Sequence, residues 1–124
     1  MCIRDRDEDE IIALFNAYEV DMIVMAGWRR IVSKKFCDEF AGRIINLHPS
    51  LLPKYKGLHA VEQAMQAGEE ETGCTVHFVN EYLDSGAIIK QQVVPILPGD
   101  TVESLTRAIQ QAEHSLLPSV INAF

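Results

Sequence analysis

The stretch RIINLHPSLLPKYKG, residues 43–57, decides how the rest of the chain is interpreted. Its first residues are typical of a short apolar strand, and Asn46 and His48 stand at the end of that strand, on either side of Leu47. Pro49 ends the strand because proline has no backbone N–H to donate and favours extended geometry in the residue before it. Ligands of open α/β sheets bind at such strand ends. Because alternate strand residues share a face, we expect Asn46 and His48 to lie together at a ligand-binding edge.

A structural role for His48 is the alternative, in which the ring only ends the strand and is held by a hydrogen bond. The residues that follow favour a functional role. The segment NLHPSLLPKYKGLHAVEQA, residues 46–64, resembles the folate-dependent formyltransferases, most closely those that act on glycinamide ribonucleotide. The likeness extends from about residue 7 to residue 124 and includes residues 73–86 and 110–118.

The family's N-terminal third has no counterpart in this sequence. That third carries a glycine-rich loop for the ribotide phosphate, whereas the seven glycines here form no Gly-x-Gly. We therefore expect residues 7–124 to be the C-terminal part of a single formyltransferase catalytic domain. Residues 1–6, MCIRDR, show no apolar period and are predicted to be a foreign or disordered leader.

Composition excludes several classes of protein. A length of 124 residues with 48% hydrophobic residues fits one core. The formal net charge of −7 argues against binding to nucleic acid or to an anionic membrane. Residues 11–25 form the most apolar long window, but polar residues interrupt it well short of the ~20 apolar residues of a membrane span.

The cysteines and the first residues bear on the compartment. Cys2, Cys37 and Cys74 are widely spaced and form no Cys-x-x-Cys pair, which argues against a disulfide framework and a zinc site. No basic leader precedes an apolar segment, so we expect no secretion signal. The sequence thus predicts a cytoplasmic enzyme that is a monomer or weak dimer, with small-molecule substrates and no metal.

Helical and strand patterns alternate in the first half of the chain. We expect a helix capped by Asp7, with Ile11, Phe15 and Tyr18 on one face. Residues 22–26 are continuously apolar, which is typical of a strand buried on both faces. Ser33 should cap a short helix with Phe36 and Phe40 on one side, before the strand that starts at Arg43. This strand, helix and strand imply a right-handed crossover.

The second half predicts a helix over residues 58–67, with Ala60, Ala64 and Ala67 on its close-packing side, and a solvated turn at residues 69–71. Residues 74–80 and 87–96 read as strands, and their short connection favours an antiparallel hairpin. A final helix from Thr101 should bury a stripe of apolar residues, and Pro118 should kink it or end it. The stripe comprises Leu105, Ile109, Ala112 and Leu116.

The resemblance implies a Rossmann-like α/β formyltransferase fold, mostly parallel, with an antiparallel C-terminal hairpin strand and helices on both faces. It implies transfer of a formyl group from 10-formyltetrahydrofolate to the amine of glycinamide ribonucleotide in purine biosynthesis. Amine attack builds negative charge on the formyl oxygen, so the reaction needs a hydrogen-bond donor and a route for a proton. Asn46 offers a donor that does not titrate, and His48 offers one that can transfer a proton.

Asp84 is the third catalytic candidate. It matches the aspartate of the family's Leu-Asp-x-Gly loop, and a carboxylate close to His48 would raise the pKa of that ring. A plain Asp-Ser-Gly turn is the alternative, because aspartate favours turns.

Further site residues are implied by the resemblance alone. The folate wall comprises Arg29, Arg30, Ile31, Val32, Asn46, Asn80, Glu81, Tyr82, Leu83 and Asp84, and the ribotide contacts comprise Gln110, Gln111, Ala112 and Glu113. The family usually carries an apolar residue at the position of Arg29. Without the resemblance, Arg29 and Arg30 would be a solvated pair and Glu113 a surface residue. His59, His77 and His114 are assigned to structure, since no pair has helical metal spacing.

Other functions stay open as alternatives. One is a catalytically impaired fragment that acts only as a folate-binding module. Another is a formyltetrahydrofolate hydrolase, in which a second histidine typically stands at the position of Pro49. A methionyl-tRNA formyltransferase would show Arg-Gly-Ala-Ala where this chain has KGLHA, and a dinucleotide oxidoreductase would show the glycine fingerprint.

Overall fold

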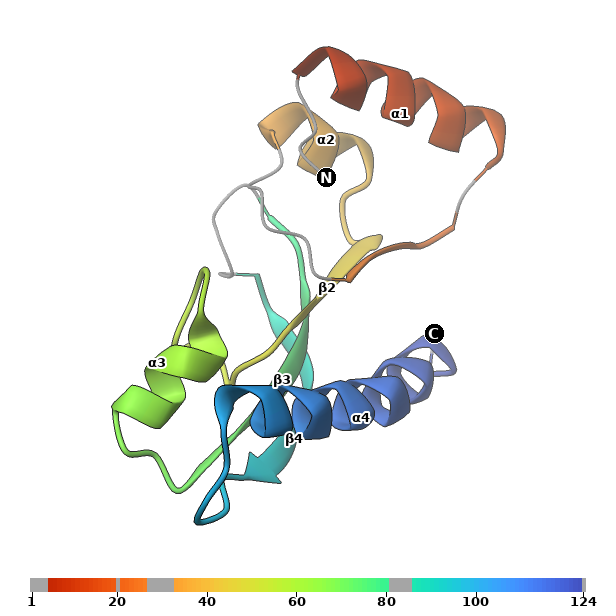
Figure 1. Cartoon of the computed structure of the whole chain (residues 1–124). Helices are drawn as coiled ribbons and strands as arrows, with labels where there is room; N and C mark the ends of the chain where they lie inside the picture. Colours follow the sequence, from red (N-terminus) through yellow and green to blue (C-terminus); the bar gives the residue numbers. More distant parts are fainter. Residues whose placement is uncertain (1–4, 20, 27–32, 81–85, 124) are drawn as a thin grey trace.

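The computed structural model describes residues 5–19, 21–26, 33–80 and 86–123 (Figure 1). Its centre is a four-stranded mixed β-sheet. The strands lie in chain order, β1 (Ile23–Ala26), β2 (Ile44–His48), β3 (Glu71–Phe78) and β4 (Ile88–Pro95). β1 pairs with β2 in parallel, whereas β3 is antiparallel to both of its neighbours. The predicted α/β fold and its antiparallel hairpin are confirmed. Within the described residues, the parallel pairing is confined to β1 and β2.

Helices cover both faces of the sheet, as predicted. α1 (Asp5–Ala17) and α2 (Lys34–Glu39) pack on the side of Ile23, Met25 and Ile44, where Phe36 and Phe40 are buried. α3 (Ala60–Gln66) and α4 (Val102–Ile121) pack on the opposite side. Figure 1 shows α4 lying across β3 and β4. None of the described helices is long and apolar enough to cross a membrane.

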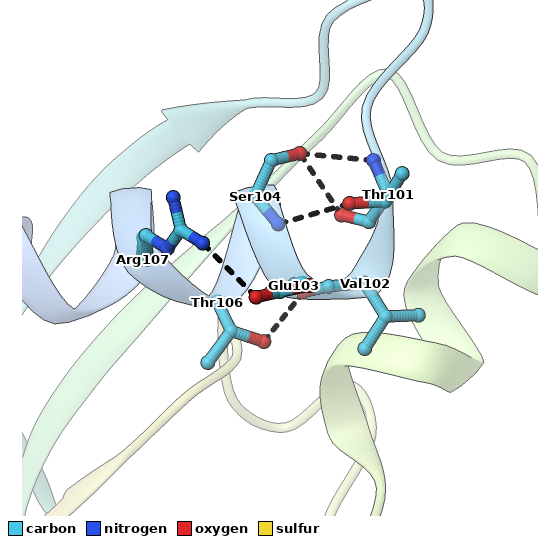
Figure 2. Close-up of polar contacts among 6 residues, drawn as sticks. All are labelled: Thr101, Val102, Glu103, Ser104, Thr106 and Arg107. Atoms are coloured by element: carbon cyan, nitrogen blue, oxygen red, sulfur yellow. Dashed lines mark hydrogen bonds and ion pairs between the residues drawn. The ribbon is translucent and has the colours of Figure 1, made fainter.

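The start of α4 shows why it begins at Val102. Thr101 Oγ1 accepts from Ser104 N at 3.1 Å, and Ser104 Oγ accepts from Thr101 N at 2.9 Å, which forms a capping box (Figure 2). Glu103 in the first turn forms an ion pair with Arg107 at 3.0 Å. Both features stabilise the N-terminal end of the helix.

Pro118 was predicted to kink α4 or to end it. The proline lies inside α4 and does not end the helix, and the kink stays a prediction. A proline in a helix removes one backbone donor, but Leu116 and Val120 on either side of it are buried in the core. This burial holds the last turn in helical form through Ile121. The predicted stripe is confirmed: Leu105, Ile109 and Leu116 are buried and Ala112 packs against them.

The N-terminal elements differ in detail from the prediction. α1 begins at Asp5, so Asp7 lies inside the helix and is not its cap. Tyr18 is 76% exposed and does not share the half-buried face of Ile11 and Phe15. Val24 in β1 is 38% exposed because β1 is the edge strand of the described sheet and the helices cover only the other face of it. The prediction that this strand is buried on both faces is therefore wrong.

α3 is shorter than the predicted helix over residues 58–67. The helix is Ala60–Gln66, and Ala60 and Ala64 are buried while Ala67 is exposed as the C-cap. Glu71 is the first residue of β3, and Glu69 makes contacts with Lys54 and Tyr55. Residues 69–71 are thus not simply a solvated turn. The ends of these elements were misplaced because sequence patterns fix the middle of an element better than its ends.

β3 is buried over most of its length, at every residue from Thr72 to His77. Thr72, Cys74 and Val76 alternate with Gly73, Thr75 and His77, so the strand has two different faces. The first set lies on the α4 side with Ile45 and Leu47. Of the second set, Gly73 and Thr75 lie under residues 49–59, called the covering loop below.

Gly73 of β3 leaves no room for a side chain, and this close packing can be tested. A Cβ atom there would collide with the Gln92 carbonyl oxygen and lie 2.8 Å from Leu51 Cδ2. We predict that Gly73→Ala lowers the free energy of unfolding by about 3 kcal/mol or more, since backbone cannot move aside cheaply. Urea denaturation measures this loss. Gly68→Ala is the control, because that site is open and has a φ of +72°, so only about 1 kcal/mol is lost. Equal losses in the two variants would contradict the close packing.

Candidate functional site

The pairing of β2 with β3 places four polar side chains in one buried group. Asn46 lies opposite His77, and His48 lies opposite Thr75. Directly opposite residues of antiparallel strands point to the same side, and so do alternate residues of one strand. All four are at most 6% exposed. We call Asn46, His48, Thr75 and His77 the polar row.

The contact between Asn46 and His77 fixes the orientation of the Asn46 amide. His77 Nδ1 lies 2.9 Å from the Phe78 carbonyl oxygen, which can only accept, so Nδ1 carries a hydrogen. In the neutral ring Nε2 is then an acceptor, and it lies 3.5 Å from Asn46 Nδ2. Asn46 therefore turns its NH₂ group toward His77. Asn46 Oδ1 is buried and has no hydrogen-bond partner among the described residues.

His48 is held by the backbone of the covering loop. Its Nε2 lies 2.8 Å from the Tyr55 carbonyl oxygen, so Nε2–H donates to that oxygen. The backbone turns sharply after the strand, where Ser50 N donates to the His48 carbonyl oxygen at 2.9 Å. The Tyr55 carbonyl oxygen thus fixes the orientation of the His48 ring.

Thr75 ties the covering loop to the sheet. Its hydroxyl donates to the Ser50 carbonyl oxygen at 2.7 Å and accepts from Leu52 N at 3.2 Å. Gln91 on β4 donates to the same hydroxyl at 3.1 Å and to the Leu52 carbonyl oxygen at 2.9 Å. These hydrogen bonds hold the covering loop over the His48 end of the polar row.

Sequence reasoning found two members of the polar row and missed the others. His77 was assigned to structure, and Thr75 was not considered, yet each lies directly beside a candidate catalytic residue. The signal that could have found them is the alternation of polar Thr75 and His77 with apolar neighbours. Strand register, which the sequence does not reveal, was needed to place them opposite His48 and Asn46.

Asp84 lies outside the described residues, and its role stays a prediction, as it does for Arg29, Arg30, Ile31, Val32, Glu81, Tyr82 and Leu83. The ends of the segment that contains Asp84 are described. Phe78 N donates to the Ala87 carbonyl oxygen at 2.9 Å, and Val79 N donates to the Ile44 carbonyl oxygen at 2.9 Å. Half-buried Asn80 follows directly.

Those ends lie at the start of β2, whereas His48 ends it. His48 pairs with Thr75, three residues before Phe78, which corresponds to roughly 10 Å along the strand. Only Ser85 stands between Asp84 and Gly86, so the Cα atoms of these two residues lie at most about 7 Å apart. A contact between Asp84 and His48 stays a prediction, because Asp84 lies outside the described residues.

The predicted ribotide residues lie on α4, on the other side of the sheet from the polar row. Gln110 and Gln111 are exposed, and Ala112 packs against the core. Glu113 is half-buried, and burial raises its pKa while nearby His114 lowers it. Burial also raises the pKa of the Cys74 thiol to about 11, and the charge of Glu113 and the backbone of Gln92 act on it in opposite directions. Contacts of these residues with a ribotide stay a prediction.

The remaining described histidines lie apart from the polar row. His59 is exposed and lies 3.5 Å from Glu62, and His114 is exposed on α4. No group of three or more His, Cys, Asp or Glu among the described residues could hold a metal ion.

The raised pKa of Glu113 predicts how stability depends on pH. The native state keeps this proton to a higher pH than the unfolded chain, so the free energy of unfolding falls as pH rises above about 4.3, the usual glutamate value. We predict that Glu113→Gln is more stable than the original chain at pH 7, by less than about 1 kcal/mol because the group is partly solvated. The difference should vanish below the unfolded value.

Glu103→Gln is the matched control on the same helix. Glu103 is exposed and paired with Arg107, so its replacement should lower stability at pH 7 by a few tenths of a kcal/mol, roughly the value of such a pair. Urea denaturation at pH 4 and pH 7 measures both variants. If Glu113→Gln lowers stability at pH 7 as the control does, the burial effect is refuted.

Comparison with known proteins places the chain in a family. Residues 3–121 match the family described as formyl transferase. Phosphoribosylglycinamide formyltransferase of Escherichia coli strain K12 is 45% identical over 121 residues, which cover 98% of this chain and 57% of that protein. The trifunctional purine biosynthetic protein adenosine-3 of Drosophila melanogaster is 51% identical over 118 residues, covering 95% of this chain and 9% of that protein.

Solved structures agree. A crystal structure of phosphoribosylglycinamide formyltransferase from Anaplasma phagocytophilum superposes with a TM-score of 0.90 at 44% identity. The match covers 94% of this chain and 57% of that one, so the chain spans a little over half the length of such relatives. The match over nearly the whole sequence, together with the shared fold, shows that this chain belongs to the formyl transferase family.

Proposed function

We propose that the full-length protein containing this chain transfers the formyl group of 10-formyltetrahydrofolate to the amine of glycinamide ribonucleotide, in the cytoplasm. The observation that carries the proposal is the buried pair Asn46 and His48 at the end of β2, inside residues 3–121 that match the formyl transferase family. The names of the relatives support the same substrates.

Asn46 supplies the hydrogen bond to the formyl oxygen. The NH₂ group of Asn46 has two hydrogens, and His77 takes one of them, so the second is left for a ligand. A donor that is preorganised in a dry site stabilises developing negative charge by about 3–4 kcal/mol. The unpartnered Oδ1 suits a ligand that also brings a donor, as the attacking amine does.

His48 handles the proton. Its Nε2–H is held by the Tyr55 carbonyl oxygen, so Nδ1 gives or takes the proton of the reaction. We assign Asp84 as the carboxylate that favours the charged His48 ring, because a nearby negative charge stabilises an imidazolium. A charged ring offers both a hydrogen-bond donor and a proton to transfer.

Two walls complete the site. We assign the folate to residues 29–32, through their backbone groups, and to residues 80–84. The ribotide contacts are assigned to residues 110–113 on α4, so the ribotide must reach past the sheet from the polar row. The half-buried Glu113 supports the assignment of the ribotide contacts. Burial destabilises its charged carboxylate, and a cationic or amine group of a ligand would stabilise it.

An assay of tetrahydrofolate formation by the full-length protein tests this function. We expect release from 10-formyltetrahydrofolate only when glycinamide ribonucleotide is present. Equal release without the ribotide would show the hydrolase instead. Binding of folate with no release under either condition would show the folate-binding module.

Replacement of the three catalytic candidates gives a sharper prediction. In the full-length protein, Asn46→Ala should lower kcat by roughly 10²–10³-fold, the usual loss for one oxyanion donor. His48→Ala and Asp84→Asn should remove nearly all transfer, and folate should still bind the His48 variant. Steady-state kinetics and a folate-binding titration measure these effects.

His59→Asn is the control, since His59 is exposed and its left-handed backbone suits asparagine. It should leave transfer unchanged. Activity within about threefold of the original in either His48→Ala or Asp84→Asn would refute the roles given to those residues. A threefold change corresponds to about 0.6 kcal/mol of activation free energy.

A further inference from the structure

The contact that holds His48 depends on a tyrosine in an unusual conformation. Tyr55 has a backbone φ of +55°, in the left-handed region that residues other than glycine and asparagine rarely adopt. This conformation aims the Tyr55 carbonyl oxygen at His48 Nε2, 2.8 Å away. Left-handed backbone costs a tyrosine roughly 1–2 kcal/mol, so other contacts must hold it.

Glu69, between α3 and β3, supplies those contacts from outside the loop. One of its carboxylate oxygens accepts from the Tyr55 hydroxyl at 3.1 Å, and the other lies 3.4 Å from Lys54 Nζ. The carboxylate thus holds two successive residues of the covering loop. Inside the loop, Ser50 Oγ donates to the Lys54 carbonyl oxygen at 2.6 Å.

The two contacts of Glu69 differ in strength. The amine of Lys54 is mostly exposed, and exposed ion pairs contribute little. The Tyr55 hydroxyl is a charge-assisted donor, which makes the stronger bond. Desolvation raises the pKa of Tyr55, and the hydrogen bond and charge of Glu69 raise it further, so the hydroxyl keeps its hydrogen at all physiological pH values.

We propose that Tyr55 and Glu69 are positioning residues for His48: the hydrogen bond between their side chains fixes the Tyr55 backbone, and the Tyr55 carbonyl oxygen fixes the His48 ring. This inference rests on the proposed function in one respect, namely that His48 transfers a proton. Without this bond the ring still lies on β2, but Nε2–H has no fixed acceptor and the ring turns more freely.

Kinetics and the His48 N–H signal of the full-length protein test the proposal together. In Tyr55→Phe and Glu69→Ala, kcat should fall about fivefold to twentyfold while KM for both substrates stays within twofold, since positioning affects the reaction more than binding. The proton signal of His48 Nε2–H, protected from solvent by its bond to Tyr55, should broaden or disappear in both variants.

Two further variants separate positioning from general damage. Glu69→Gln keeps an oxygen that accepts from Tyr55, so it should retain both the signal and kcat within about twofold, a factor near 0.4 kcal/mol. Lys54→Ala removes only the exposed ion pair and should behave likewise. The double variant Tyr55→Phe/Glu69→Ala should lose no more than either single variant, because both break one bond.

The signal of His48 decides the proposal even if the full-length protein shows no formyl transfer. Loss of the signal in Tyr55→Phe and Glu69→Ala would support the positioning role and leave only the proposed function refuted. An unchanged signal in both variants would overturn the positioning role, whatever the kinetics show. Loss of the signal in Glu69→Gln or Lys54→Ala as well would also overturn it, since the bond between Tyr55 and Glu69 would then not be its cause.

Discussion

The antiparallel register between β2 and β3 is the constraint on which the site depends. It sets Asn46 opposite His77 and His48 opposite Thr75, and it directs all four side chains to one face. A slip of one residue would move every side chain of a strand to the other face. Here the other face is the apolar core under α4, with Ile45, Leu47 and Val76. Burial of that core therefore fixes the register, and the register places the polar row.

A buried row of polar side chains costs stability unless its atoms are hydrogen-bonded. His77 bonds to the Phe78 backbone, His48 to the Tyr55 backbone, and Thr75 to the covering loop. Asn46 Oδ1 is the exception among the described side chains that are buried. The orientation that leaves it unpaired is imposed by His77, and a ligand that brings a donor to the site would satisfy it. Stability alone does not explain this unpaired oxygen.

Much of this arrangement could be predicted from residues 43–57. Asn46, His48 and Pro49 indicated a strand end with two polar side chains on one face, and the motif indicated the family and the fold. His77 could not be recognised, because its meaning depends on a cross-strand neighbour 31 residues away. Burial of β1 was overestimated for a similar reason: an apolar run does not reveal whether its strand lies at an edge of the sheet. The contacts of Tyr55 depend on backbone conformation, which the sequence PKYKG does not specify.

The central claim is that Asn46 and His48 act together on the formyl group. A crystal structure of the full-length protein with glycinamide ribonucleotide and a stable analogue of 10-formyltetrahydrofolate tests it most directly. The account predicts that Asn46 Nδ2 and the His48 ring both lie within about 3 Å of the analogue's formyl position, with a ligand donor on Asn46 Oδ1 and the Asp84 carboxylate beside His48. A formyl position bound away from β2, with Asn46 Oδ1 still unpartnered, would contradict it.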